Sequence, residues 1–124
     1  MKILALDYGS ARTGVAVSDP TGTVARPVGI VASVNKTAGF GELIALIRAE
    51  EPELVVVGLP LTLKGEHGAQ AEETAVFVER LRAAVEVPVE MWDERFTSVL
   101  ADGDDARAAA HLLSSFLAWR SSRV

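Results

Sequence analysis

The sequence predicts an α/β fold, with a mixed five-stranded sheet that carries helices on both of its faces. Three observations lead to this expectation. Three extended segments follow one another in the first 34 residues, separated by turns rich in glycine, proline and polar residues. Two continuous apolar runs come later, and segments with helical periodicity precede, separate and follow them. A three-stranded meander followed by helix-linked parallel strands gives a mixed sheet.

The first three strands are expected in residues 2–8, 14–19 and 23–34. The first is a short apolar run that ends on Asp7, and the glycine-bearing turn after it favours a hairpin with the second strand. Pro27 has no backbone N–H to donate. The third strand is therefore expected at an edge of the sheet, or to carry a bulge.

Helical periodicity marks three further segments, in residues 35–53, 69–85 and 104–120. In the first, Leu43, Ile44 and Ile47 fall on one face, and Pro52 ends the helix. The runs ELVVVGLPL and VPVEMWDER are the remaining strands, and the former is expected to be buried on both faces. The residues expected to face inward from the second and third helices are Ala71, Ala75, Val78, Leu81, Ala106, Ala109, Ala110, Leu113 and Leu117.

The bulk composition restricts the classes of function. The chain of 124 residues is long enough for one domain, residues 1–124. It has no cysteine, so any metal site is expected to hold a hard, oxygen-liganded ion such as Mg²⁺ or Mn²⁺. No stretch approaches the ~20 apolar residues of a membrane span, so we expect a cytoplasmic protein without a membrane partner. The net charge of −5 argues against a protein that coats nucleic acid, but not against an enzyme with a basic rim around an acidic centre.

Acidic residues follow the first and last predicted strands and open the last predicted helix. They are Asp7, the pair Asp93 and Glu94, and the pair Asp104 and Asp105. Carboxylates that meet at one sheet edge repel one another unless cations lie between them. Two divalent ions ~3.5–4 Å apart can activate a water for phosphodiester hydrolysis. Asp7 is the expected bridging ligand because it ends the central strand, with Glu94 and Asp105 beside it.

Each acidic residue also has a structural interpretation. Asp7 could begin an Asx-turn, and Asp104 or Asp105 could cap the last helix. Asp93 and Glu94 have opposite strand parity, so at most one of them points into a shared site. The sequence leaves the choice between these two open.

Cationic residues are expected at the same edge of the sheet. Arg12, Lys64 and Arg95 lie in predicted loops there, where they could hold a phosphate backbone. The loop that contains Lys64 lacks the residue order of a phosphate-binding P-loop. Trp92 could stack on a base, but we expect it to pack in the core or at its margin.

Four motifs occur in order along the chain, LDYGSARTGVAVSD, VVVGLPLTLKGEHGAQA, DERFTS and DARAAAHLLSSFL. Together they resemble the YqgF/RuvX family, which is similar to the Holliday junction resolvase RuvC and to RNase H. The resemblance implies an RNase H-like fold and a magnesium-dependent nuclease that acts in 5′-end maturation of the 16S ribosomal RNA precursor. By motif, it places the catalytic and metal-binding carboxylates at Asp7, Glu94 and Asp105, and substrate-supporting residues at Arg95 and Thr97.

The sequence departs from the family between Glu94 and Asp105. Family members usually carry a longer charged segment there, whereas only a short connection is present in this chain. We therefore expect either a shortened member or a segment missing near residues 101–103.

Other functions stay open at this stage. The resemblance also implies, as an alternative, a Holliday junction resolvase that acts on branched DNA. A non-catalytic module could bind RNA, a transcription factor or a ribosome-assembly factor. The first motif is also similar to the phosphate-binding turn of actin-like ATPases, but those proteins need two such domains. Precursor ribosomal RNA is the expected nucleic-acid partner.

Overall fold

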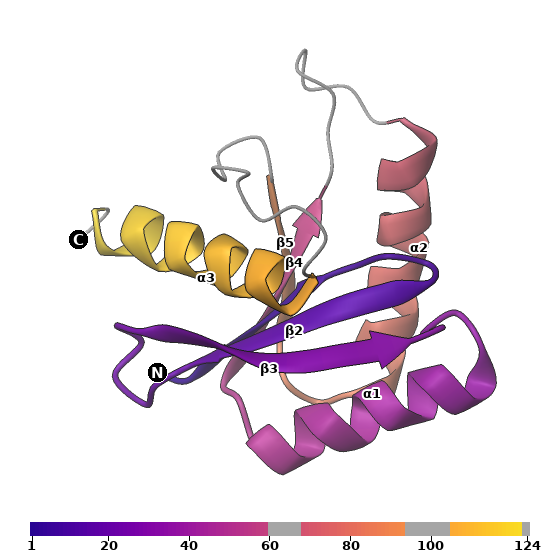
Figure 1. The fold of residues 1–124 in the computed structure, drawn as a ribbon, viewed down its shortest axis with the longest axis horizontal. Helices are drawn as coiled ribbons and strands as arrows, with labels where there is room; N and C mark the ends of the chain where they lie inside the picture. The colour runs from indigo at the N-terminus through magenta and orange to yellow at the C-terminus, as the bar shows by residue number, and fades with distance from the viewer. Residues whose placement is uncertain (60–67, 94–104, 123–124) are drawn as a thin grey trace.

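The five-stranded sheet expected from the sequence is present (Figure 1). The structure, a computed structural model, describes residues 1–59, 68–93 and 105–122, and for Asp105 it describes the backbone alone. The strands are β1 (Ile3–Asp7), β2 (Arg12–Ser18), β3 (Ala25–Ala32), β4 (Leu54–Leu59) and β5 (Val89–Asp93). The helices are α1 (Thr37–Glu50), α2 (Ala69–Ala84) and α3 (Asp105–Ser121).

Strand β1 lies at the centre of the sheet, in which the order is β3-β2-β1-β4-β5. It pairs antiparallel with β2 and parallel with β4, which in turn pairs parallel with β5. The first three strands therefore form the expected meander, and α1 and α2 connect the parallel strands.

Proline 27 has the position expected of a residue that cannot donate to a sheet. Strand β3 is an edge strand, and its register against β2 shifts between Val15 and Ala16. Val15 pairs with Gly29 and Ala16 with Pro27, so one residue of β3 is left over as a bulge. Both alternatives given by the sequence, an edge and a bulge, are confirmed.

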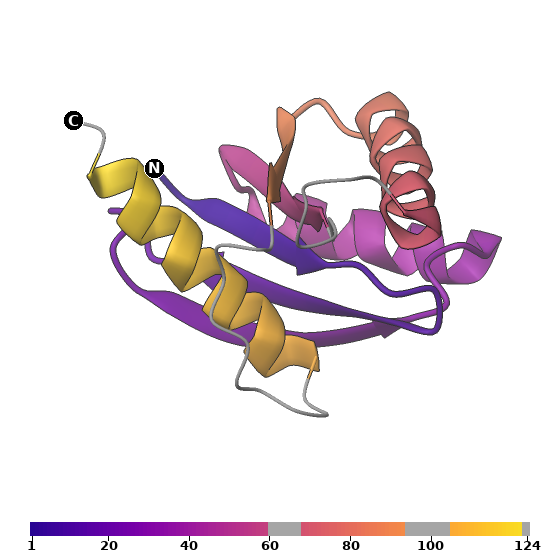
Figure 2. The same ribbon diagram turned by 90° about the horizontal axis from the view of Figure 1, so that it is seen from above.

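The two faces of the sheet are covered by different helices. Helix α3 lies on one face, and α1 and α2 lie on the other (Figure 2). Side chains of a strand alternate between faces, so Leu4 and Leu6 of β1 pack in the core beneath α1 and α2, whereas Ile3 and Ala5 pack beneath α3. All four are at most 1% exposed, so β1 is buried on both sides.

Helix α1 matches its sequence pattern. Leu43, Ile44 and Ile47 are buried, as expected. The helix ends at Glu50, and Glu51 turns the chain with a left-handed backbone (φ 50°) before Pro52.

The inward face of α2 was predicted only in part. Ala71, Val78 and Leu81 are buried, but Ala75 is half-buried, and Thr74 and Phe77 occupy the core. The ring of Phe77 contacts Tyr8 and Phe40 and so fills space that an alanine cannot reach. The prediction of Ala75 as a core residue is therefore wrong.

Helix α3 packs through Ala109, Leu113 and Leu117, as expected, but also through Leu112 and Phe116. Ala106 and Ala110 are half-buried. Trp92 is 8% exposed and meets Phe116 edge-on, with ring centroids 5.8 Å apart, so its expected packing role is confirmed. None of the helices in the described ranges has the length and apolarity needed to span a membrane.

We predict opposite effects on stability for two glycine substitutions in α1. A Cβ on Gly39 would overlap the backbone carbonyl oxygens of Ala32 and Ser33, whereas a Cβ on Gly41 would meet nothing within 4 Å. Gly39→Ala should lower the free energy of unfolding by about 1–3 kcal/mol. Gly41→Ala should raise it by about 0.5–1 kcal/mol, since alanine is the better helix former. Urea unfolding of both variants tests this, and equal stabilisation by both would contradict the close packing of α1 on the β3–α1 connection.

We also predict an acid-dependent contribution from Asp19 in the β2–β3 turn. Its carboxylate accepts hydrogen bonds from the backbone N–H groups of Thr23 and Val24 and from the Thr21 hydroxyl. These bonds hold the pKa of Asp19 well below its usual value, the Thr21 bond most strongly. A depressed folded-state pKa stabilises the protein above the unfolded-state pKa, near pH 4. The stability difference between wild type and Asp19→Asn should be constant at neutral pH and shrink below about pH 4. A difference that grows on acidification would contradict this assignment.

Candidate active site

Asp7 lies at the end of the central strand, where the backbone is fixed by strand pairing and by buried neighbours. It is the last residue of the central strand β1, is paired with Gly14 of β2 and is half-buried. Its neighbours in the chain, Leu6 and Tyr8, are 0% and 8% exposed. By strand alternation with Ile3 and Ala5, its side chain belongs to the face covered by α3. A carboxylate held between buried neighbours is costly to desolvate without compensating charge or hydrogen bonds.

Asp93 lies at the same edge of the sheet as Asp7. Leu6 is in register with Val57, and Leu59 is in register with Asp93, so the parallel strands β1, β4 and β5 all end there. Two strand spacings put the backbones of β1 and β5 about 10 Å apart. Trp92 packs under α3, so the next residue, Asp93, belongs to the opposite face from Asp7.

Helix α3 begins at this edge as well. Near its C-terminal end, Arg120 Nη1 donates to Sδ of Met1 over 3.0 Å, so that end of the helix lies by the start of β1 (Figure 2). The helix therefore runs opposite to β1, and its first residue, Asp105, lies toward the strand end that carries Asp7. The structure thus brings the backbones of Asp7, Asp93 and Asp105 to one end of the molecule.

The remaining predicted site residues are only partly described. Arg12 opens β2, beside the β1–β2 turn, and is exposed. Lys64, Glu94, Arg95 and Thr97 lie outside the described residues, as does the side chain of Asp105.

The β1–β2 turn next to Asp7 is fixed by hydrogen bonds from both sides. Buried Thr13 donates its hydroxyl to the Gly9 carbonyl (3.1 Å) and accepts from the Gly9 N–H (3.4 Å). The N–H of Ser33 donates to the carbonyl of Ala11 (2.9 Å). A Cβ on Gly9 would overlap the carbonyl oxygen of Arg12, so this close turn requires glycine.

A polar hollow of about 300 Å³ opens between this turn and the start of α2. Residues 8–12 form one wall, and Gln70 and Glu73 of α2 form the other. Tyr8 is stacked on Phe77, with ring centroids 4.5 Å apart and planes inclined by 27°. Burial raises the pKa of the Tyr8 phenol, and the negative charge of Glu73 raises it further against the opposing Arg80. Tyr8 is therefore a neutral phenol at physiological pH.

Gln70 and Glu73, which line this hollow, were not predicted from the sequence. They lie three residues apart on α2, so their side chains share one face of the helix. The available signal was their place at the start of the helix that follows β4, because β4 ends at the same sheet edge as Asp7.

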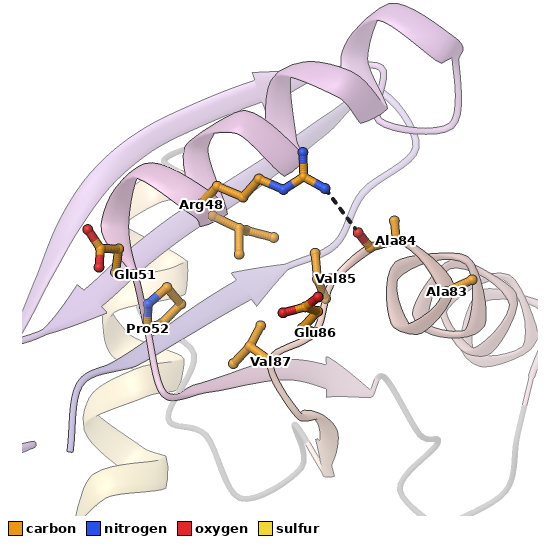
Figure 3. Close-up of a pocket in the computed structure, with 9 residues that line it drawn as sticks. Arg48, Glu51, Pro52, Ala83, Ala84, Val85, Glu86 and Val87 are labelled. Carbon is orange, nitrogen blue, oxygen red and sulfur yellow. Dashed lines mark hydrogen bonds between the residues drawn. The ribbon is translucent and has the colours of Figure 1, made fainter.

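A second hollow, of about 530 Å³, lies between the C-terminal ends of α1 and α2 (Figure 3). Pro52, in its lining, precedes β4, so this hollow lies at the opposite sheet edge from Asp7. Arg48 reaches across it toward the carbonyl of Ala84 at 3.5 Å. Glu51 and Glu86 also line it, and two helix C-termini add partial negative charge. This environment disfavours phosphate, so the hollow is not the candidate active site.

The donor chemistry at the Asp7 edge fits a hard divalent cation. The described residues there offer carboxylate oxygens, from Asp7 on the α3 face and from Asp93 on the other face, and the sequence contains no cysteine. Within residues 1–59, 68–93 and 105–122, no three acidic or histidine side chains gather closely enough to hold a metal ion. Two of the three expected ligand side chains, those of Glu94 and Asp105, lie outside that set.

Comparison with known proteins identifies the family. Residues 1–118 match the family model described as RuvX, Holliday junction resolvase. A Chloroflexus aurantiacus protein named "Putative pre-16S rRNA nuclease" is 43% identical over 100 residues, which cover 81% of this chain and 65% of that relative. A protein of the same name from Nitratidesulfovibrio vulgaris is 36% identical over 133 aligned residues and covers 95% of this chain and 94% of the relative.

The second alignment is longer than the 124-residue chain, so the Nitratidesulfovibrio relative contains residues with no counterpart here. Among solved structures, RuvC of Thermus thermophilus in complex with a Holliday junction substrate superposes with a TM-score of 0.58. Its sequence identity is 18%, over 98% of this chain and 96% of that chain, so the likeness shows the fold. The four sequence motifs, the matched family model and the RNase H-like sheet agree: this chain belongs to the RuvX family.

Proposed function

We propose that this chain is a divalent-metal-dependent nuclease that hydrolyses phosphodiester bonds in the 5′ region of the 16S ribosomal RNA precursor. The observation that carries the proposal is the half-buried Asp7 carboxylate at the end of the central strand, with the start of α3 at the same sheet edge. The names of the Chloroflexus and Nitratidesulfovibrio relatives support the substrate. A cytoplasmic site of action and contact with ribosome-assembly or transcription factors belong to the same proposal.

In the proposed site, Asp7, Glu94 and Asp105 hold Mg²⁺ or Mn²⁺. Bound ions would supply an activated water and stabilisation of the leaving oxygen. Asp7 is suited to the central ligand position because its backbone is fixed by pairing on β1 and by burial of both neighbours. Arg12, Lys64, Arg95 and Thr97 are proposed to hold the nucleic-acid backbone.

Strand parity favours Glu94 over Asp93 as the third ligand. Asp7 and Trp92 belong to the face covered by α3, whereas Asp93 belongs to the other face. A ligand that reaches the same ion as Asp7 has to come from the α3 side. We therefore assign Asp93 a supporting role outside the metal site.

The description of the family and the likeness to RuvC favour a second candidate function, resolution of branched DNA. A module that binds RNA without cleaving it is disfavoured. Such a module gains nothing from a half-buried carboxylate at the position where phosphates have to lie.

We predict that Asp7→Asn abolishes cleavage while the protein stays folded. The amide keeps the shape of the side chain but removes the charge that binds a metal ion. Loss of activity should be at least about 100-fold, since even the outer partners of metal ligands contribute 10- to 100-fold. The assay uses a precursor 16S ribosomal RNA fragment and a four-way DNA junction, each with Mg²⁺, Mn²⁺ or chelator.

The matched control is Asp93→Asn, the same chemical change at the same edge but on the other face of the sheet. It should retain metal-dependent cleavage, and Glu94→Gln should lose it. Equal activity of Asp7→Asn and wild type on every substrate would refute the nuclease proposal. Cleavage of the junction but not of the RNA would favour the resolvase instead.

A further inference from the structure

The polar hollow beside Asp7 has a position that suits recognition of a substrate. Its first lining residue, Tyr8, directly follows Asp7 in the chain. Two residues of extended chain span at most about 7 Å, so the turn at Gly9 lies within that distance of the Asp7 backbone. The Asp7 side chain belongs to the α3 face and Tyr8 to the face under α1 and α2, so a nucleotide next to the phosphate at Asp7 would enter the hollow by crossing the end of the sheet.

The turn that forms one wall of the hollow is preorganised, whereas Gln70 and Glu73 on the other wall are exposed side chains. The hydrogen bonds between Gly9 and Thr13 fix the turn, and the stack of Tyr8 on Phe77 fixes the ring beneath it. On the other wall, Gln70 and Glu73 project from a regular helix of 16 residues. Groups held in place before binding lose little entropy when a ligand arrives.

The charges of the hollow restrict the chemistry of its ligand. Arg12 offers cationic donors, whereas Glu73 offers an acidic side chain that, when ionised, only accepts hydrogen bonds. An isolated phosphate would be repelled by Glu73, and an amine would be repelled by Arg12. A suitable ligand carries an anionic group and, a short distance away, a neutral hydroxyl donor. A ribonucleotide has this combination in its phosphate and its 2′-hydroxyl, which distinguishes RNA from DNA.

We propose that this hollow receives the ribose of a nucleotide adjacent to the scissile phosphate, and that Glu73 and Gln70 recognise its 2′-hydroxyl. The proposal rests on the proposed nuclease function and assigns RNA rather than DNA as the substrate class. The volume of about 300 Å³ is at the lower end for ligand sites, which suits one nucleotide. Gln70 complements Glu73 because its amide can also donate to the hydroxyl oxygen.

The test measures binding without cleavage. In an Asp7→Asn background, fluorescence anisotropy compares a short single-stranded RNA with DNA of the same sequence. The Asp7→Asn protein should bind RNA about 10- to 100-fold more tightly than DNA, which corresponds to the free energy of one hydrogen bond to a charged group. Adding Glu73→Ala should reduce the preference to near unity by weakening RNA binding alone, and Gln70→Ala should reduce it less.

Glu72→Ala is the matched control. It removes the same charge from the adjacent position on α2, but Glu72 does not line the hollow. The RNA preference should be unchanged in this variant. Thermal unfolding of the Glu72 and Glu73 variants verifies that both are folded to the same extent.

A chemical double-mutant cycle locates the contact. RNAs with a single 2′-deoxy substitution at successive positions are bound to the proteins with and without Glu73→Ala. At one position, the 2′-deoxy substitution should weaken RNA binding about 10-fold or more in the protein that has Glu73. It should have no effect in the Glu73→Ala protein, since both changes remove the same interaction. Equal losses in both proteins at every position would overturn the assignment.

The two proposals fail separately. An RNA preference that survives Glu73→Ala, or equal weakening of RNA and DNA, overturns the assignment of Glu73 even if Asp7-dependent cleavage is found. Conversely, a Glu73-dependent RNA preference in a protein that cleaves nothing overturns the nuclease function and leaves recognition of the 2′-hydroxyl supported.

Discussion

The burial of β1 on both faces is the constraint on which the rest of the structure depends. Leu4 and Leu6 belong to the core under α1 and α2, and Ile3 and Ala5 belong to the core under α3. A one-residue slip of this strand would exchange its side chains between two cores of different shape. The register is therefore strongly fixed, and with it the position of Asp7. A carboxylate placed at the end of such a strand can serve as a rigid ligand without a dedicated supporting loop.

At the sheet edge that carries Asp7, the net negative charge of the chain and local positive charges have opposite effects on nucleic acid. The chain has a net charge of −5, so its overall field repels a polyanion. In the proposed function, binding of nucleic acid at Asp7 depends on local charge, from the metal ions and from arginine and lysine side chains such as Arg12. At the far edge, Glu51, Glu86 and two helix C-termini outweigh the cation that lines that hollow, Arg48. The charge distribution therefore favours approach from one end of the sheet, with few contacts outside the site.

Much of the fold could be predicted from the sequence because several residues are compatible with only one kind of local structure. Pro27 cannot donate to a ladder, Pro52 cannot continue a helix, and the apolar run of β4 suits only a doubly covered strand. Ala75 was misassigned because helical spacing leaves the margins of an apolar stripe open, and the buried stripe of α2 extends toward Phe77 rather than toward Ala75. Glu73 was not predicted because its place in the polar hollow depends on the turn at Gly9, which is distant in sequence. The motif assignment of Glu94, Arg95, Thr97 and Lys64 stays a prediction.

The position of α3 has a consequence for how the chain folds during its synthesis. This helix, the last one described, covers Ile3, Ala5, Ala16 and Val56, which come from strands made much earlier in synthesis. Until α3 emerges from the ribosome, the nascent sheet exposes that apolar face to solvent and to chaperones. Asp105 enters with the same helix. Completion of the hydrophobic core and arrival of a proposed metal ligand are thus one event, so under the proposed function a partly translated chain is not yet able to cleave RNA.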